Sequence, residues 1–298
     1  MADHDLAGFE RSGFSHGGRT HEVLRRGSGP AVIVIAEIPG ITPKVLEFAE
    51  RVADIGCTAV LPVLFGKPGY DPHPSAHGAL KSGLYTASTV LRVCVSREFT
   101  LFATGRSSPV VTWLRALAAD EHERCGGPGV GAVGMCLTGG FALAMATDER
   151  LLAPVLSQPS LPVPGLGSRS RAIDISPAEL AVVKDRCANG GLNVLGLRFR
   201  GDRLAPGNRF DFLRRELGEA FIAVELDDST ANPDAVLPPH AVLTEHLIDE
   251  PGQPTRAALD QVLDLFRSRL LEGEGEGEGE GEGDGGGDGE GGDGESGK

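Results

Sequence analysis

The chain has 298 residues and a formal net charge of −14, most of which belongs to its last segment. Residues 272–298 repeat Glu-Gly and Asp-Gly and contain 11 acidic residues and one lysine, so the other 271 residues carry 27 basic and 31 acidic side chains. This near balance argues against nucleic acid as a partner. A segment without apolar residues cannot offset the entropy lost on ordering, so we predict one domain over 1–271 and a disordered acidic tail over 272–298.

Apolar runs and cysteine usage set further limits. No apolar segment reaches the roughly 18 residues that span a membrane, and the polar start lacks the apolar core of a secretory signal. The five cysteines are odd in number and scattered, which argues against a disulfide framework or a zinc knuckle. We therefore expect a cytoplasmic protein that binds neither a membrane nor a metal. The excess of arginine over lysine is typical of a high-GC bacterial genome.

Apolar runs alternate with helical patterns from residue 31 onward. Ala31–Ala36 is continuously apolar, as a strand covered on both faces would be, and Thr42 then caps a helix that begins at Pro43. Cys57–Phe65 is the next predicted strand, and residues 66–80 form a Pro/Gly/His loop. The remaining predictions are helices at Pro109–Glu123 and Thr255–Leu270 and strands at Val130–Val133, Leu152–Leu156, Leu192–Phe199 and Phe221–Leu226. Strands that alternate with helices predict an α/β fold with a doubly wound, mostly parallel sheet.

The segment Leu161–Gly191 lies between two predicted strands and has two interpretations. It begins with Pro, Gly and Ser residues and continues as Ser176-Pro-Ala-Glu179, a capping box that predicts a helix to about Arg186. This segment could form a cap over an active site or an ordinary crossover helix. A crossover explains the helix with fewer assumptions, so we favour it.

The segment Gly131–Gly140 carries the first chemical signal. A short apolar strand runs into Cys136, with Gly134 and Thr138 two residues to either side, and an apolar helical run follows. Small residues at those two positions let the chain turn sharply and expose a nucleophile, as in the nucleophile elbow of α/β-hydrolases. A helix N-terminus would also favour the thiolate form of the cysteine. The alternative is a buried structural cysteine in a glycine-rich turn.

A nucleophilic thiol needs a base to accept its proton and an acid to orient that base. Asp202 and His240 each follow a predicted strand, and with the cysteine they give the α/β-hydrolase order of nucleophile, acid and histidine. Asp227 and Asp228 are rival acids directly after a strand, and His246 is a rival base. We interpret His240 as the base because its preceding loop is long enough to return over the strand ends. Taken alone, each residue could instead be a turn former or a loop residue.

Glu37 closes the apolar strand that begins at Ala31. Ligands of open α/β sheets bind at the carboxyl ends of the strands, which is where this carboxylate would lie. Burying it without a partner would be expensive, so Glu37 either faces the site or is hydrogen-bonded. A surface residue at a strand exit is the simpler alternative.

Four motifs taken together resemble the dienelactone hydrolase family. They are Glu37-Ile-Pro-Gly, the Gly-Met-Cys136-Leu elbow, Gly201-Asp202 and His240. The resemblance covers about residues 14–270, and the order Glu, Cys, Asp, His is more specific than any single motif. It implies an α/β-hydrolase fold, with a doubly wound sheet flanked by helices, and a cysteine nucleophile.

The resemblance also implies roles for individual residues. Cys136 would attack a lactone or ester carbonyl, with His240 as the base and Asp202 orienting the imidazole. Glu37 would contact the resting thiol and help to generate the thiolate when substrate enters.

The resemblance assigns the oxyanion hole to the backbone N–H groups of Ile38 and Leu137. Two departures from the family pattern qualify it. Thr138 stands where the family usually has glycine, and Ala241–Glu245 lacks the arginine with which dienelactone-cleaving members bind the substrate carboxylate. Arg198, Arg200 and Arg203 lie near Asp202 in the sequence and could replace that residue.

Two other motifs have weaker readings. Gly129–Gly134 fits the dinucleotide fingerprint G-x-G-x-x-G, but its own valines form the predicted strand instead of following one. His73 and His77 have a spacing that binds metal on a helix, yet prolines at 72 and 74 make a helix improbable and favour a solvated loop.

The sequence therefore predicts a hydrolase that cleaves a small-molecule lactone or ester through a cysteinyl thioester. It predicts no cofactor and no metal, and a monomer or small homo-oligomer. The alternatives are a thioesterase or acyltransferase that uses the same site, a binding protein that kept the fold without turnover, and a nucleotide-binding module.

Overall fold

A computed structural model describes residues 6–95, 108–160 and 173–272, with the backbone alone for 90–95. Residues 161–172 of the Leu161–Gly191 segment and all but the first residue of the predicted tail lie outside these ranges. In the described part of the chain, no helix combines the length and apolar character needed to cross a membrane.

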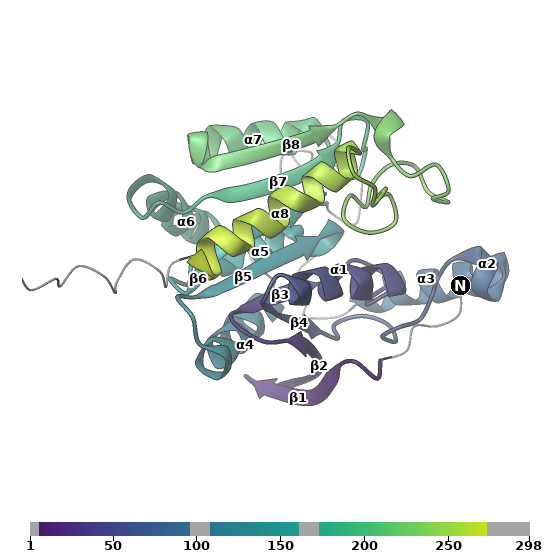
Figure 1. The fold of residues 1–298 in the computed structure, drawn as a ribbon, viewed down its shortest axis with the longest axis horizontal. Coiled ribbons are helices and arrows are strands. Elements are labelled where there is room, and N and C mark those ends of the chain that lie inside the picture. The colour runs from purple at the N-terminus through teal and green to yellow at the C-terminus, as the bar shows by residue number, and fades with distance from the viewer. Residues whose placement is uncertain (1–5, 96–107, 161–172, 273–298) are drawn as a thin grey trace, which may run out of the picture.

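The chain folds around one eight-stranded sheet, in the order β1-β2-β4-β3-β5-β6-β7-β8 (Figure 1). Its strands are β1 (Glu10–His16), β2 (Arg19–Gly27), β3 (Ala31–Ile35), β4 (Thr58–Pro62), β5 (Val130–Met135), β6 (Leu151–Ser157), β7 (Val194–Phe199) and β8 (Phe221–Leu226). β2 pairs antiparallel with β1 and with β4, and the other neighbours are parallel. The predicted α/β fold with a mostly parallel sheet is confirmed.

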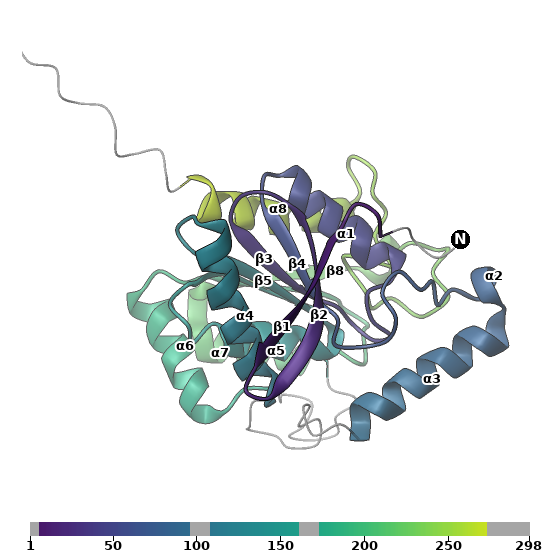
Figure 2. The ribbon, with the colours of Figure 1, turned by 90° about the horizontal axis from the view of Figure 1, so that it is seen from below.

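Helices cover both faces of this sheet (Figures 1 and 2). Those described are α1 (Pro43–Asp54), α2 (Pro74–His77), α3 (Ala79–Val95), α4 (Val110–Cys125), α5 (Gly139–Met145), α6 (Pro177–Asn189), α7 (Gly207–Leu217) and α8 (Pro254–Leu270). α1 and α8 pack on one face, while α4, α5, α6 and α7 pack on the other. Coverage of both faces explains why the central strands are apolar without alternation.

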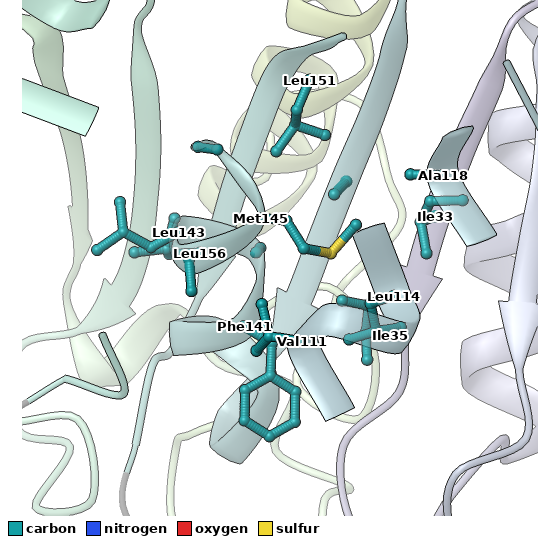
Figure 3. Close-up of a cluster of buried hydrophobic side chains, with 14 of the residues drawn as sticks. Ile33, Ile35, Val111, Leu114, Ala118, Phe141, Leu143, Met145, Leu151 and Leu156 are labelled. Carbon is teal, nitrogen blue, oxygen red and sulfur yellow. The ribbon is translucent and has the colours of Figure 1, made fainter. Parts of the chain in front are cut away.

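The core on the α4–α5 face includes Leu137 of the elbow, and Cys136 packs against it; Figure 3 shows part of this core. Ile33 and Ile35 of β3 meet Leu114 of α4, and Phe141 and Met145 of α5 lie beside them. Each of these side chains is at most 1% exposed. Burial of a side chain of this size contributes about 1.5–3 kcal/mol, so the short helix after Cys136 is fixed by packing more than by its own length.

Helix starts follow the predicted capping chemistry. The Thr42 hydroxyl accepts a hydrogen bond from the Val45 N–H, and proline occupies the first helical position of α1. Ser176 and Glu179 form the predicted capping box of α6. α6 connects β6 to β7 and packs beside α5 and α7, so the described part of that segment is a crossover helix.

The loop predicted over residues 66–80 is wrong in its second half. α2 begins at Pro74 with His73 as its N-cap, and α3 begins at Ala79. Proline is tolerated at the first helical position because the N–H there has no partner in any case, so the prolines do not exclude this turn. The hairpin of β1 and β2 was not predicted because β1 is largely exposed and carries little apolar alternation.

The topology places the candidate site at a switch point of the sheet. β3 is bordered by β4 on one side and β5 on the other, so the direction of the chain's progress across the sheet reverses there. Ligands of open α/β sheets bind at the carboxyl ends of strands beside such a reversal. Glu37 follows β3 and Cys136 follows β5.

Candidate active site

Cys136 lies in a sharp turn between β5 and α5. Its φ is 54°, in the left-handed region that non-glycine residues rarely occupy and where strain is found at functional sites. A Cβ on Gly134 would lie 2.1 Å from the Thr138 carbonyl oxygen, and one on Gly139 would lie 2.7 Å from the Cβ of Pro159. Only glycine fits at these two positions, as the predicted elbow requires.

Thr138 gives the elbow a tie to the neighbouring strand. Its hydroxyl donates to the Ile35 carbonyl at 2.7 Å and accepts from the Met135 N–H at 2.8 Å. The side chain is fully buried. Threonine therefore replaces the family's usual glycine without opening the turn, because its hydroxyl is satisfied by backbone on both sides.

Asp202 and His240 form a hydrogen-bonded pair. Asp202 follows β7, and its Oδ2 lies 2.7 Å from His240 Nδ1. Its Oδ1 accepts from the Leu204 N–H at 2.8 Å, which fixes the carboxylate. Burial by itself would raise the pKa of Asp202, but the hydrogen bond and positive charge of His240 outweigh burial and hold that pKa below its usual value.

The electrostatics of His240 link it to Cys136. Burial by itself lowers the pKa of His240, but the negative charge of a Cys136 thiolate and the hydrogen bond to Asp202 raise the pKa to about 11. Nε2, the ring nitrogen away from Asp202, is buried and has no partner of normal hydrogen-bond geometry in the described residues. The imidazole is thus held at Nδ1 and retains a nitrogen for proton transfer.

The rival residues have structural roles. Asp227 Oδ1 accepts from the Ser229 N–H at 2.9 Å, and Asp228 Oδ1 accepts from the Gly201 N–H at 2.8 Å. His246 is 2% exposed, accepts from the Ala241 N–H at 3.1 Å and lies 3.0 Å from the Leu237 carbonyl. Both ring nitrogens of His246 are occupied by backbone, so of the two histidines only His240 contacts a candidate acid.

Glu37 is buried and hydrogen-bonded, which is one of the two predicted alternatives, but its carboxylate makes no hydrogen bond to the thiol. One carboxylate oxygen accepts from the Thr244 hydroxyl at 2.5 Å and the other from the Gln158 amide at 3.1 Å. The Cys136 sulfur instead lies 2.8 Å from the Ser160 hydroxyl oxygen. The contact between Glu37 and the resting thiol that the resemblance implies is therefore not formed, because both carboxylate oxygens are bound elsewhere.

Ile38 and Leu137 lie at the ends of neighbouring strands. Ile38 directly follows Glu37 at the exit of β3, and Leu137 directly follows Cys136 at the exit of β5. β3 and β5 are paired in parallel up to Ile35 and Gly134. The first N–H groups of a helix have no intrahelical partner, which suits Leu137 to anion binding.

Sequence reasoning missed three residues of this network. Gln158 lies at the exit of β6 with a φ of 36°, and its Oε1 accepts from the Val242 N–H at 3.3 Å. Ser160 follows two residues later. Arg209 on α7 is 1% exposed and donates to the Pro159 carbonyl at 2.5 Å. Gln158 could have been found by the argument used for Glu37, a polar side chain after a buried strand, whereas Arg209 carries no local signal.

Arg209 places a buried positive charge beside the acid and the thiol. Burial lowers the pKa of Arg209 to about 10, and the negative charges of Asp202 and Cys136 act in the opposite direction. Its guanidinium also donates to the Leu204 carbonyl at 3.0 Å. Arg209 therefore joins the segment after β6 to the segment that carries Asp202.

Of the three arginines that could replace the missing one, Arg198 is already bound to other residues. Arg198 is 4% exposed, and its guanidinium binds the Glu225 carboxylate at 2.5 Å and the Ala205 carbonyl at 2.8 Å. Arg200 and Arg203 are exposed. Arg198 is thus committed to the β7–β8 pair, which leaves it unsuited to bind a substrate.

The two weaker motifs also have structural placements. Val130 to Gly134 of the glycine motif lie within β5, as predicted. His73 caps α2, with its Nδ1 accepting from the Ser75 N–H, and His77 stacks on Tyr70. Within the described ranges, no cluster of three or more His, Cys, Asp or Glu side chains could hold a metal ion.

Comparisons with known proteins agree with this architecture. The family model described as the dienelactone hydrolase family matches residues 21–163. No curated protein matches the chain. A dienelactone hydrolase from Anabaena variabilis superposes with a TM-score of 0.55 at 16% identity, covering 88% of this chain and 98% of that one. A candidate dienelactone hydrolase from Klebsiella pneumoniae gives 0.54 at 17%, covering 87% and 97%.

A third structure in this comparison is a dienelactone-hydrolase-like promiscuous phosphotriesterase, P91, from metagenomic libraries. It gives a TM-score of 0.52 at 18% identity and covers 88% of this chain and 98% of its own. At these identities the superpositions establish the fold. Together with the family model, this fold supports a hydrolase enzyme. The family model adds a sequence match, so the chain is similar to the dienelactone hydrolase family over residues 21–163.

Proposed function

We propose that this hydrolase cleaves an uncharged ester or lactone through a covalent thioester on Cys136. The Cys136 sulfur adds to the carbonyl carbon, and the resulting tetrahedral intermediate collapses to a thioester as the alkoxide leaves. His240 takes the thiol proton and gives it to the departing oxygen. Water, deprotonated by His240, then hydrolyses the thioester and restores the thiol.

The observation that carries this proposal is the 2.7 Å contact between Asp202 and His240 in the same molecule as the strained Cys136 turn. The carboxylate binds Nδ1 and so leaves Nε2 for the thiol and the leaving group. A thiolate beside an imidazolium is a nucleophile that exists at neutral pH, and the raised pKa of His240 favours that ion pair.

The backbone N–H groups of Ile38 and Leu137 would stabilise the oxyanion. Both belong to chain segments that leave neighbouring strands; Leu137 is buried, and the partly buried Ile38 packs against the core. Glu37 supports this arrangement indirectly, because its bonds to Gln158 and Thr244 fix the exit of β3 that precedes Ile38. An oxyanion donor fixed before reaction avoids reorganisation when charge develops.

Turnover of a p-nitrophenyl ester by the full chain tests the proposal. C136A should abolish steady-state turnover. When the wild-type protein is quenched during turnover, its intact mass should rise by one acyl group, and peptide mapping should place that group on Cys136. C187A is the matched control, because burial raises the pKa of the Cys187 thiol and that variant should keep wild-type turnover.

Two outcomes would contradict the proposal. Undiminished turnover by C136A would exclude the nucleophile, and acyl labelling without release would indicate a binding protein or an acyl carrier. Addition of a second thiol or alcohol separates hydrolysis from acyl transfer, since a transferase would form the new ester at the expense of free acid.

A further inference from the structure

Gln158, Pro159 and Ser160 directly follow β6 and contact several elements of the site. Gln158 binds the Glu37 carboxylate and the backbone beyond His240, and the Pro159 carbonyl accepts from buried Arg209. Ser160 reaches Cys136. These three residues are thus hydrogen-bonded to four separate segments at this edge of the sheet. Their side chains are therefore fixed before any substrate arrives.

Ser160 makes two hydrogen-bond contacts with Cys136, one through its backbone and one through its side chain. Its N–H donates to the Cys136 carbonyl at 2.9 Å, and its hydroxyl oxygen lies 2.8 Å from the Cys136 sulfur. The side chain is 7% exposed. In the described residues the sulfur is the hydrogen-bond partner of this hydroxyl, and the Pro159 carbonyl just before it is held by Arg209.

We propose that Ser160 is a positioning residue for the nucleophile, and that its hydroxyl, in place of Glu37, holds the Cys136 sulfur and donates a hydrogen bond to the thiolate. The proposal rests on Cys136 being the nucleophile of the proposed function. A serine hydroxyl has one hydrogen to donate, and a thiolate accepts it more strongly than a neutral thiol does. The hydroxyl therefore favours the charged form that reacts.

The contacts of Glu37 explain why Ser160, and not Glu37, is the partner of the sulfur. Both Glu37 oxygens are bound to neutral donors on other segments, so the carboxylate is held away from the sulfur. A carboxylate against a thiolate would also repel it, whereas a hydroxyl would not. The thiolate is thus paired with His240 and Ser160, whereas Glu37 joins the exit of β3 to Gln158 and Thr244.

The pH dependence of Cys136 alkylation by iodoacetamide, followed by peptide mass mapping, tests this role. The midpoint at the lower pH is the pH at which half of the Cys136 thiol is ionised. S160A should raise this midpoint by about one pH unit, because one hydrogen bond to the charged form is lost. Below the midpoint this shift corresponds to a tenfold loss of thiolate. The Ser160 N–H contact is backbone and survives the substitution. E37Q is the matched comparison and should leave the midpoint unchanged.

S160T and S160V form an isosteric pair that differs mainly in the hydroxyl, so they keep the test decisive if S160A does not fold. The threonine variant should keep the wild-type midpoint and the valine variant should raise it. With a p-nitrophenyl ester, kcat/KM of S160A should fall about tenfold below the midpoint and recover as the pH rises. A merely structural role would lower kcat/KM equally at every pH.

The proposal is overturned if S160A, or S160V relative to S160T, leaves the midpoint unchanged. It is also overturned if E37Q moves the midpoint as far as S160A does, since Glu37 would then be the partner of the thiol. Alkylation requires no turnover, so this result stands apart from the test of the proposed function, in which C136A decides whether Cys136 is the nucleophile at all.

Discussion

Two buried carboxylates stand at the same edge of the sheet, and they have different partners. Asp202, after β7, is bound to His240, a side chain that can carry charge. Glu37, after β3, is bound to a hydroxyl and an amide, neither of which titrates. A carboxylate at a strand end is therefore not in itself catalytic, because its hydrogen-bond partner decides whether it can take part in proton transfer.

The surroundings of the two carboxylates differ in charge as well. On the Asp202 side, the buried Arg209 and the partly buried His240 and Cys136 supply charges of both signs. On the Glu37 side acidic charge outweighs the positive charge of Lys44: burial first, and then the negative charge of Glu37, raise the pKa of Glu245 to about 7. On the Asp202 side, a change in the charge of one group is offset by the opposite charge of a neighbour. On the Glu37 side, a further negative charge would be repelled by the acidic residues already there.

Neutralising each carboxylate is the largest test of this difference. D202N should lower kcat about 10³-fold or more, because the amide cannot hold His240 as the carboxylate does, and H240A should have an effect of the same order. E37Q, the matched neutralisation, should lower kcat less than tenfold. Steady-state kinetics with one activated ester measures all three. A thousandfold loss in E37Q would restore Glu37 as a catalytic group.

Thiol reactivity gives the next largest contrast. Iodoacetamide at pH 7 should label Cys136 at least about a hundredfold faster than Cys57, Cys125 or Cys187, because burial raises the pKa of each of those three thiols, to about 11 for Cys57. Peptide mass mapping over time gives the four rates. Equal or faster labelling of any of the three would contradict a thiolate at Cys136, and H240A should remove the advantage.

The sequence was sufficient where local pattern decides structure. The strand Phe221–Leu226, the caps at Thr42 and Ser176 and the order of Cys136, Asp202 and His240 all follow from neighbouring residues. These features are fixed by propensity and chain order, which a single sequence displays. The choice of Asp202 over Asp227 and Asp228 depended on the family resemblance, because all three residues follow predicted strands.

The contacts of Glu37 could not be predicted in this way. Its partners, Gln158 and Thr244, lie 121 and 207 residues further along the chain. Ser160 and Arg209 likewise meet the site only because the sheet brings their segments together. A polar residue at a strand exit has several possible neighbours of equal chemistry, and packing alone selects among them.

Substrate charge tests the acidic side of the comparison. An uncharged ester should have a kcat/KM at least about tenfold above that of the matching carboxylate-bearing ester, because Ala241–Glu245 contains no arginine and Arg198 is bound to Glu225. Parallel kinetics on the two esters at low ionic strength gives the ratio. A preference for the carboxylate that is lost in R203A or R200A would show that one of these exposed arginines binds the anion.

The smallest expected effect is on stability near Glu245. Burial and the charge of Glu37 raise the pKa of Glu245 to about 7 from an ordinary value of 4.5, so the folded state holds this proton more tightly than the unfolded state. The stabilisation from protonation is fully present below pH 4.5 and is lost as the pH rises to about 7. Allowing for partial exposure, E245Q should raise the free energy of unfolding by about 1–2 kcal/mol at pH 8 and leave it unchanged at pH 4.

Urea unfolding at the two pH values measures this, with E250Q as the control because Glu250 is exposed on the same segment. A gain in E245Q that is equal at both pH values would mean that the glutamine packs better, and that the two carboxylates do not repel each other.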